Sequence, residues 1–283
     1  LPFQELAART GATLKWFELE DEGRILSNTA DEVITERTKI VAVTHVGNTT
    51  GAITDIAPMV KRAHEVGAVV VLDACQSVPH LKIDLHALDV DFAAWSAHKM
   101  YGPTGVGFLY GKRDMLEALP PANFGGSMVE LAWMDQEAQY MAPPARFEAG
   151  TQPVAQVVAA GVAAEWLMNI GMENLEAHER VIAGELLKMG QIDGVRILGP
   201  QTNEQRIGTV AFEIDGVHPH DVGQFIDAQG IAIRVGHHCA QPVHRHFGVY
   251  ASNRASSGIY NSVEDAQALV EALKKVRPFF GVE

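Results

Sequence analysis

The sequence predicts an α/β fold, in which a mainly parallel sheet with helices on both faces is followed by a smaller C-terminal α+β domain. In the first half of the chain, β-branched apolar runs alternate with amphipathic segments. This pattern is typical of parallel strands joined by helical crossovers. After residue 150, two long helical segments precede shorter strand patterns. We therefore expect a large domain over residues 1–155, and a linking helix with a second domain over 156–283.

Four apolar runs of the first half indicate buried strands, because strands covered on both faces lack polar alternation. They span residues 39–46, 68–74, 92–97 and 105–111. A further strand is expected over 14–19. Helices are expected near the beginning of the chain, over 29–37 with Thr29 and Asp31 as candidate caps, and over 55–67, which Gly67 ends.

The second half begins with two long helical segments, at 151–171 and 172–190. Shorter strand and helix patterns then alternate, and we expect these strands to pair antiparallel. The strand patterns lie at 195–200, 207–214, 231–236 and 254–260, and the helical ones at 220–229 and 262–276.

Composition excludes several classes of protein. The 283 residues carry 22 Lys and Arg against 35 Asp and Glu, a net charge of −13, which disfavours general binding to nucleic acid phosphates. No apolar run is long enough to cross a membrane. Two cysteines form no disulfide framework and indicate a reducing compartment, the cytoplasm. Because residue 1 is Leu, we expect further residues to precede it in the full gene product.

Lys99 follows an apolar run and precedes a Gly-Pro turn. An arbitrary lysine there would extend its amine to the surface. In an apolar site, however, a lysine loses its proton readily and forms Schiff bases with carbonyl cofactors. Ser96 and His98 flank it as donors for a phosphate group. Lys99 is thus a candidate cofactor-binding and catalytic residue.

Asp73 ends an apolar run in VLDACQS, and Gln76 follows three residues later. An aspartate there is often only a turn residue. Pyridoxal 5′-phosphate (PLP), however, needs an acid beside its ring nitrogen to act as an electron sink. An Asp and Gln pair followed by S-x-H-K is consistent with such a site.

Cys239 lies among several histidines in RVGHHCAQPVHRHFG. It is a candidate nucleophile, because positive neighbours such as Arg234 favour the thiolate. A buried structural cysteine and a metal site remain alternatives, although the spacing matches no standard zinc pattern. Metal ligands would come from His237, His238, Cys239, His244 and His246.

Arg254 opens the apolar run of NRASSGIYN. An arginine at this place can hold a carboxylate through two parallel hydrogen bonds. The alternative is an arginine that lies on the surface without a ligand.

Six motifs in order resemble the cysteine desulfurase and selenocysteine lyase branch of fold-type I PLP enzymes, and most closely the SufS-type (group II) desulfurases. They are THVGNTTG, LDACQSV, SAHKMYGPTGVG, RFEAGT, RVGHHCAQP and NRASSGIYN. The resemblance covers essentially the whole chain. It also implies that the family's phosphate loop and its ring-stacking histidine would precede Leu1, so the family fold is N-terminally incomplete here.

The resemblance implies a role for each matching residue. Lys99 would hold PLP covalently and move the Cα proton, and Cys239 would accept sulfur. The remaining cofactor contacts would come from Asp73 at the ring nitrogen, Gln76 at the phenolic oxygen, Ser96 and His98 at the phosphate, and Thr151 at the phosphate of a partner subunit in a homodimer. Asn48 and Arg254 would bind the substrate carboxylate, and Asn48 would also contact the cofactor. Arg234 would line the pocket near the thiol.

The activity implied is conversion of L-cysteine to L-alanine, with sulfur kept as a persulfide on Cys239 and passed to a SufE- or SufU-type acceptor for iron–sulfur cluster assembly. A selenocysteine lyase or another fold-type I PLP lyase is the nearest alternative. An inactive fragment or a scaffold protein that keeps the fold is another. No metal is expected.

Overall fold

The computed structural model describes residues 1–282, which form two compact units. Unit 1 comprises Leu1–Val41, His45–Ala68 and the chain from Glu176 onward. Unit 2 comprises Ala42–Thr44 and Val69–Leu175. The predicted division of the chain at residue 155 remains a proposal about its domains.

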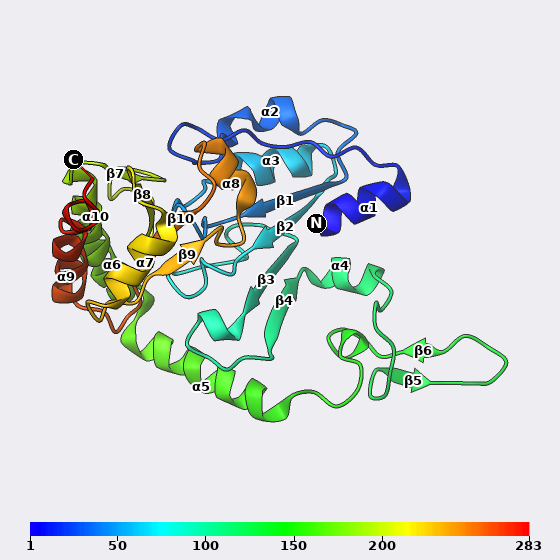
Figure 1. Cartoon of the computed structure of the whole chain (residues 1–283). Helices are drawn as coiled ribbons and strands as arrows, with labels where there is room; N and C mark the ends of the chain where they lie inside the picture. The colour runs from blue at the N-terminus through cyan, green and yellow to red at the C-terminus, as the bar shows by residue number, and fades with distance from the viewer. Residues whose placement is uncertain (283) are drawn as a thin grey trace. The chain divides into compact units, whose positions relative to one another are not determined.

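Unit 2 contains a four-stranded sheet in the order β1-β2-β3-β4 (Figure 1). The strands are β1 (Ile40–Thr44), which crosses into this unit from unit 1, β2 (Val69–Asp73), β3 (Phe92–Ser96) and β4 (Gly107–Gly111). Strands β2 and β3 are parallel, whereas β4 returns antiparallel to β3 after the 3₁₀ turn η2 (Ala97–Lys99). The carboxyl ends of β2 and β3 therefore lie at one edge of the sheet, where ligands bind in α/β folds.

The rest of unit 2 is less regular. Its elements are helix α4 (Arg113–Ala118), the antiparallel pair β5 (Val129–Leu131) and β6 (Gln139–Tyr140), the turn η3 (Ala145–Phe147) and helix α5 (Val154–Ile170). Helix α5 has no polar stripe, and its exposed residues include Val158, Val162 and Met168, which are 61–74% exposed. A helix that is apolar around its circumference is normally buried.

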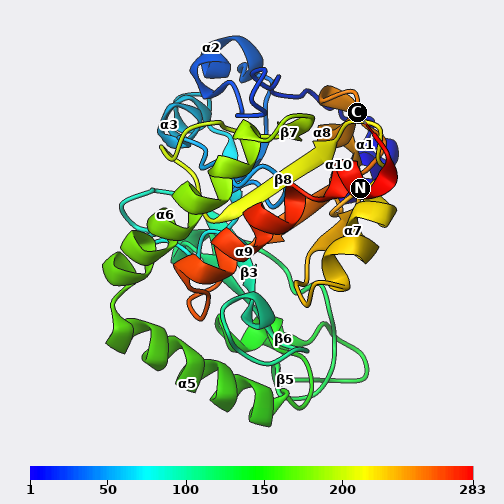
Figure 2. The ribbon, with the colours of Figure 1, turned by 60° about the vertical axis from the view of Figure 1, so that its left-hand side comes forward.

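Unit 1 contains a second sheet, ordered β7-β8-β10-β9, in which every pair is antiparallel, as predicted. Its strands are β7 (Val195–Ile197), β8 (Thr209–Ile214), β10 (Ser252–Ser256) and β9 (Arg234–Gly236). Helices α6 (Met172–Leu187), α7 (Pro219–Asp227) and α9 (Val263–Leu273) join β8 in one hydrophobic core (Figure 2). Phe212, Ile226 and Leu273 are almost completely buried there.

The remaining helices of unit 1 are short. They are α1 (Pro2–Thr10), the turn η1 (Ser27–Thr29), α2 (Ala30–Val33), α3 (Ala57–Glu65), the turn η4 (Lys188–Gln191), α8 (Gln241–His246) and α10 (Val276–Phe280). The predicted helices near the beginning and over 55–67 are thus confirmed as α1 and α3. Helix α9 begins with a capping box, in which Ser262 and Asp265 satisfy each other's backbone N–H groups.

Three predicted elements differ from the structure. Residues 14–19 form no strand, since Leu19 makes only an isolated bridge to Ile25 and the segment has no neighbouring strand to pair with. The predicted helix 29–37 stops at Val33, where a β-branched run lowers helix propensity. The last strand is shifted to Ser252–Ser256, since these residues pair with β8 at Thr209–Phe212 and with β9 at Arg234–Gly236.

No single helix in the described part of the chain is long and apolar enough to cross a bilayer. Helix α5 and the following segment Met172–Gln191 meet the length and composition criterion only as a pair.

Candidate functional site

The predicted site residues fall into two sets, one in each unit. Unit 2 holds the residues predicted to bind the cofactor, except Asn48. They are Asp73, Gln76, Ser96, His98, Lys99 and Thr151. Unit 1 holds Cys239 and the residues predicted to bind substrate, which are Asn48, Arg234 and Arg254.

In unit 2, the register of β2 and β3 gathers the first set at one edge of the sheet. Asp73 ends β2 opposite Ala94 of β3. Ser96 ends β3 two residues further on, and Lys99 ends the η2 turn that follows. Because parallel strands end on the same side, a carboxylate, a hydroxyl and an amine share this edge.

The pKa of the Cys75 thiol depends on three of these groups. Burial raises its pKa, the charge of Asp73 raises it further, and the Lys99 ammonium and a hydrogen bond with Ser96 oppose this. Asp73 Oδ1 also accepts the Cys75 N–H at 2.9 Å. A carboxylate, a hydroxyl and a primary amine thus lie at this edge of the sheet, a donor set that suits a cofactor with a cationic ring nitrogen and an aldehyde carbon.

The residues of this first set differ in exposure. Lys99 is exposed, as are Asp73 and His98, whereas Gln76 is half-buried. Within unit 2, therefore, apolar side chains do not enclose the amine, because the 3₁₀ turn after β3 directs this residue toward solvent. Thr151 is also exposed and follows Gly150, which has a positive φ of 82°.

In unit 1, Cys239 lies in a tight connection between β9 and α8. His238 and Cys239 adopt φ angles of 50° and 60°. Left-handed backbone strains residues that carry a Cβ by about 1–2 kcal/mol each. Such strain is found where a side chain must be aimed, and here it presents an exposed thiol.

Two arginines face each other beside this segment. Arg254 of β10 is the direct cross-strand partner of Arg234 on β9, so both side chains leave the same face of the sheet. Burial lowers the pKa of Arg254, the Arg234 charge lowers it further, and Cys239 raises it. The buried Nε of Arg254 has no hydrogen-bond partner among residues 1–282. Two facing guanidinium groups with an open donor suit an anion.

Asn48 joins the cysteine segment to Arg254. Its Nδ2 donates to the His238 carbonyl at 2.6 Å, and its own carbonyl accepts Arg254 Nη1 at 2.9 Å. The Asn48 loop is fixed in turn by buried Arg206, which donates to the Thr50 and Thr209 carbonyls. Gly51 allows this close approach, because a Cβ at its φ of 71° would lie 2.3 Å from the Thr209 carbonyl oxygen.

The histidines around Cys239 are engaged with protein groups. His238 and His244 are buried, and the ring centroids of His237 and Tyr250 are 5.0 Å apart. His246 Nε2 lies 2.8 Å from the Glu20 carbonyl. Within residues 1–282, no cluster of three or more His, Cys, Asp or Glu side chains is arranged to hold a metal ion.

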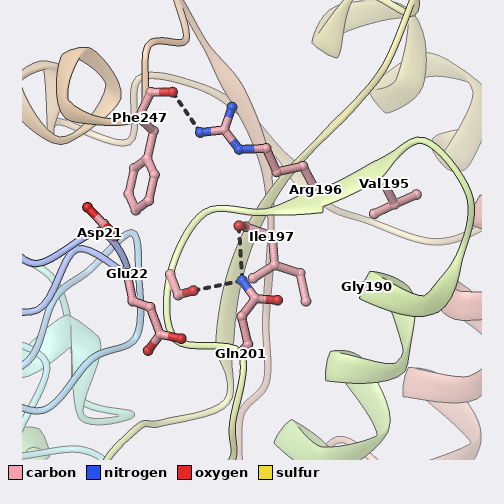
Figure 3. Close-up of a pocket in the computed structure, with 9 residues that line it drawn as sticks. Asp21, Glu22, Gly190, Val195, Arg196, Ile197, Gln201 and Phe247 are labelled. Carbon is pink, nitrogen blue, oxygen red and sulfur yellow. Dashed lines mark hydrogen bonds between the residues drawn. The ribbon is translucent and has the colours of Figure 1, made fainter.

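A cavity of about 410 Å³ in unit 1 contains none of the predicted site residues (Figure 3). Its lining includes Asp21, Glu22, Val195, Ile197, Gln201 and Phe247. Arg196, which also lines it, donates to the Phe247 carbonyl at 2.7 Å and pairs with Glu213 at 3.0 Å. The guanidinium of Arg196 is therefore already engaged with protein groups, whereas Nε of Arg254 is not.

Sequence reasoning missed two residues at these places. Cys75 contributed only to the cysteine count, although it stands between Asp73 and Gln76. Ser252 lies two residues before Arg254, so strand alternation places both on one face of β10. The alternation could have shown this, but the strand was expected to begin only at Arg254.

Comparison with known proteins supports one family. The family model for class-V aminotransferases matches residues 1–269. The probable cysteine desulfurase 2 of Mycobacterium leprae is 49% identical over all of this chain and 67% of its own length. The probable cysteine desulfurase of Streptomyces coelicolor is 47% identical over 99% of this chain and 67% of its own length.

Solved structures agree. The cysteine desulfurase CsdA of Escherichia coli gives a TM-score of 0.93 at 35% identity, over 98% of this chain and 69% of that one. A cysteine desulfurase from Thermococcus onnurineus gives 0.93 at 33% identity, over 97% and 68%. The chain therefore belongs to the class-V aminotransferase family. Within that family, the relatives and structures that it resembles are cysteine desulfurases.

Proposed function

We propose that this protein is a PLP-dependent cysteine desulfurase, which converts L-cysteine to L-alanine and keeps the sulfur as a persulfide on Cys239. One observation carries the proposal. The strained segment that carries the exposed thiol is hydrogen-bonded at its His238 carbonyl to Asn48, which in turn accepts a bond from Arg254, an arginine with an open buried donor. This places a nucleophile and a carboxylate site in the same unit. An aminotransferase has no need of the thiol.

We propose that the edge of the unit 2 sheet holds PLP. Lys99 would bind its aldehyde carbon, Asp73 its ring nitrogen and Gln76 its phenolic oxygen. Ser96 and His98 would bind its phosphate, and Thr151 of the partner subunit would reach the same phosphate. When bound, PLP supplies an electron sink for the charge left when the substrate Cα loses a proton. The position of Asp73, Ser96 and Lys99 at the carboxyl ends of β2 and β3 supports this placement.

The chain's own residues supply binding and proton transfer. Arg254 and Asn48 would hold the substrate carboxylate, with Arg234 adding positive charge from the facing strand. The Lys99 amine would take up the Cα proton as a general base. The Cys239 thiolate attacks the substrate sulfur, forming an S–S bond as the Cβ–S bond breaks. The electron pair stays on Cβ, where a proton from solvent would complete the methyl group of alanine, and Lys99 would return the proton to Cα.

The wider setting follows from the same proposal. Exposed Cys239 suits transfer to a protein acceptor of the SufE or SufU type, for iron–sulfur cluster assembly. The apolar exposed face of α5 supports a homodimer, in which Thr151 would reach the partner's cofactor. Two free thiols support the cytoplasm as its compartment.

The test compares three variants of the full chain. Lys99→Ala should lose the visible absorption of bound PLP, whereas Lys61→Ala, at an exposed lysine of unit 1, should keep it. Cys239→Ser should keep the absorption but form no alanine from L-cysteine. Alanine formed at an undiminished rate by Cys239→Ser would contradict the persulfide step. A strong preference for selenocysteine, with little turnover of cysteine, would instead indicate a selenocysteine lyase.

A further inference from the structure

One buried hydroxyl joins both ends of the segment that carries Cys239. Ser252, on the central strand β10, is completely buried. Its Oγ lies 3.0 Å from His238 Nε2 and 2.9 Å from His244 Nε2. His238 immediately precedes Cys239, and His244 lies in helix α8 beyond it. Ser252 thus connects the segment to the sheet on both sides of the thiol.

The direction of these hydrogen bonds follows from the acceptor at one end. His244 Nδ1 lies 3.0 Å from the Ala240 carbonyl, which can only accept, so Nδ1 carries the proton. In this tautomer, His244 Nε2 accepts the Ser252 O–H. Ser252 Oγ in turn accepts the His238 Nε2–H. A single order of protons therefore satisfies every bond from His238 to Ala240.

The neutral state of His238 is supported by its surroundings. Burial lowers the pKa of His238 to about 4, the charge of Arg254, the neighbouring His244 and the charge of Arg234 lower it further, and a hydrogen bond with the Ser252 backbone opposes them. Its Nδ1 is buried and has no hydrogen-bond partner among the described residues. Without a proton, this atom is a bare acceptor, and the ring's only donor is the Nε2–H directed at Ser252.

The backbone needs such a support. His238 and Cys239 are consecutive residues with positive φ angles, and neither is glycine. A strained conformation persists only where surrounding contacts fix it. The described contacts that do so are the Asn48 bond to the His238 carbonyl and the Ala240 N–H bond to the His237 carbonyl, at 2.6 and 2.8 Å, together with the Ser252 bonds.

We propose that His238, Ser252 and His244 form a hydrogen-bond relay that holds Cys239 in the orientation needed for attack on the substrate sulfur. The three are positioning residues, which act through the backbone of the segment and need not touch the substrate. The proposal rests on the proposed desulfurase function. We expect these residues to affect the rate of sulfur transfer and not the binding of substrate or cofactor.

The chain offers a matched control for loss of the hydroxyl. Ser257 is also a buried serine of unit 1, five residues further on, and its Oγ donates to the Gly208 carbonyl at 3.2 Å. Ser252→Ala and Ser257→Ala each remove one buried hydroxyl, but only the first breaks the relay. A second pair tests the donor itself. His238→Ala removes the Nε2–H, whereas His238→Gln keeps an amide N–H near its position.

Two measurements on the full chain read out the relay. Hydrogen exchange of the Ala240, His244 and Val249 amides follows the segment directly, since these N–H groups bond within residues 237–249. Exchange in Ser252→Ala should be about tenfold faster or more, and Ser257→Ala should match the wild type. Steady-state kinetics should show kcat about 10- to 100-fold lower in Ser252→Ala, with an unchanged KM for L-cysteine.

His238→Ala should resemble Ser252→Ala, and His238→Gln should recover most of the lost rate. Exchange and kcat in Ser252→Ala that equal those of Ser257→Ala would overturn the relay, and so would a failure of His238→Gln to recover. Should Ser252→Ala fail to fold, the two His238 variants decide the question. If the wild-type chain forms no alanine, the desulfurase proposal fails, while the exchange comparison still tests the relay.

Discussion

Arg206 offers a demanding test of how unit 1 is held together. Its side chain is buried, and its guanidinium donates to four backbone carbonyls instead of pairing closely with a carboxylate. They belong to Pro200, Ile207, Thr209 and Thr50. Burial lowers its pKa to about 10, helped by the Arg24 charge and opposed by Glu22. The group therefore remains charged at pH 7, and Arg206→Met removes the charge and all four bonds.

The bond lengths allow the effect to be sized. The bonds to Thr209, at 2.6 Å, and to Pro200 are short, whereas those to Ile207 and Thr50 are 3.3 and 3.4 Å. Two good bonds from a charged group contribute about 3–6 kcal/mol together. Methionine avoids the desolvation of the guanidinium but leaves buried carbonyls without donors. We expect Arg206→Met to lower the free energy of unfolding by about 3–5 kcal/mol.

Urea unfolding of the full chain, followed by circular dichroism, measures this change. The corresponding fall in Tm is about 5–15 °C. Arg180→Met is the control, because Arg180 is exposed on α6 of the same unit, and its effect should stay within about 0.5 kcal/mol. A Tm of Arg206→Met within about 2 °C of the wild type would refute this reasoning. It would mean that the four hydrogen bonds only offset the cost of desolvating the guanidinium and add little to the free energy of unfolding.

Three further predictions concern single side chains. Cys75 should react slowly with iodoacetamide at pH 7, because burial and then Asp73 raise its pKa. Asp73→Asn should speed the reaction, which peptide mass mapping measures, and an equal rate in the variant would contradict the prediction. Arg254→Lys should raise the KM for L-cysteine about 10-fold or more, through loss of the paired donors; unchanged steady-state kinetics would argue against carboxylate binding. Asn253→Val should leave Tm unchanged or higher, because both amide atoms of Asn253 are buried without partners among the described residues; a fall of several degrees would show that the amide is bonded.

Local sequence pattern located most of the elements that position the site. The apolar runs at 39–46, 68–74 and 92–97 correspond to β1, β2 and β3. Burial on both faces was predicted, but burial alternates along β1, where Val41 and Val43 are buried and Ile40 and Ala42 are exposed. The same pattern is enough to place Asp73 and Lys99 at the ends of strands. It failed at 14–19, since a strand also needs a neighbour that accepts its backbone bonds, and no local sequence specifies that neighbour.

The sequence by itself determined the two kinds of sheet, the polar residues at their strand ends and the motif around Cys239. Tertiary structure alone decided the antiparallel return of β4, the register that sets Arg234 opposite Arg254, and the exposure of Lys99. It also decided that Ser252 bridges His238 and His244. The physical reason is that hydrophobic periodicity indicates the type of each element and the side on which it is buried. The features decided by the tertiary structure depend instead on contacts between strands and loops that are distant in sequence.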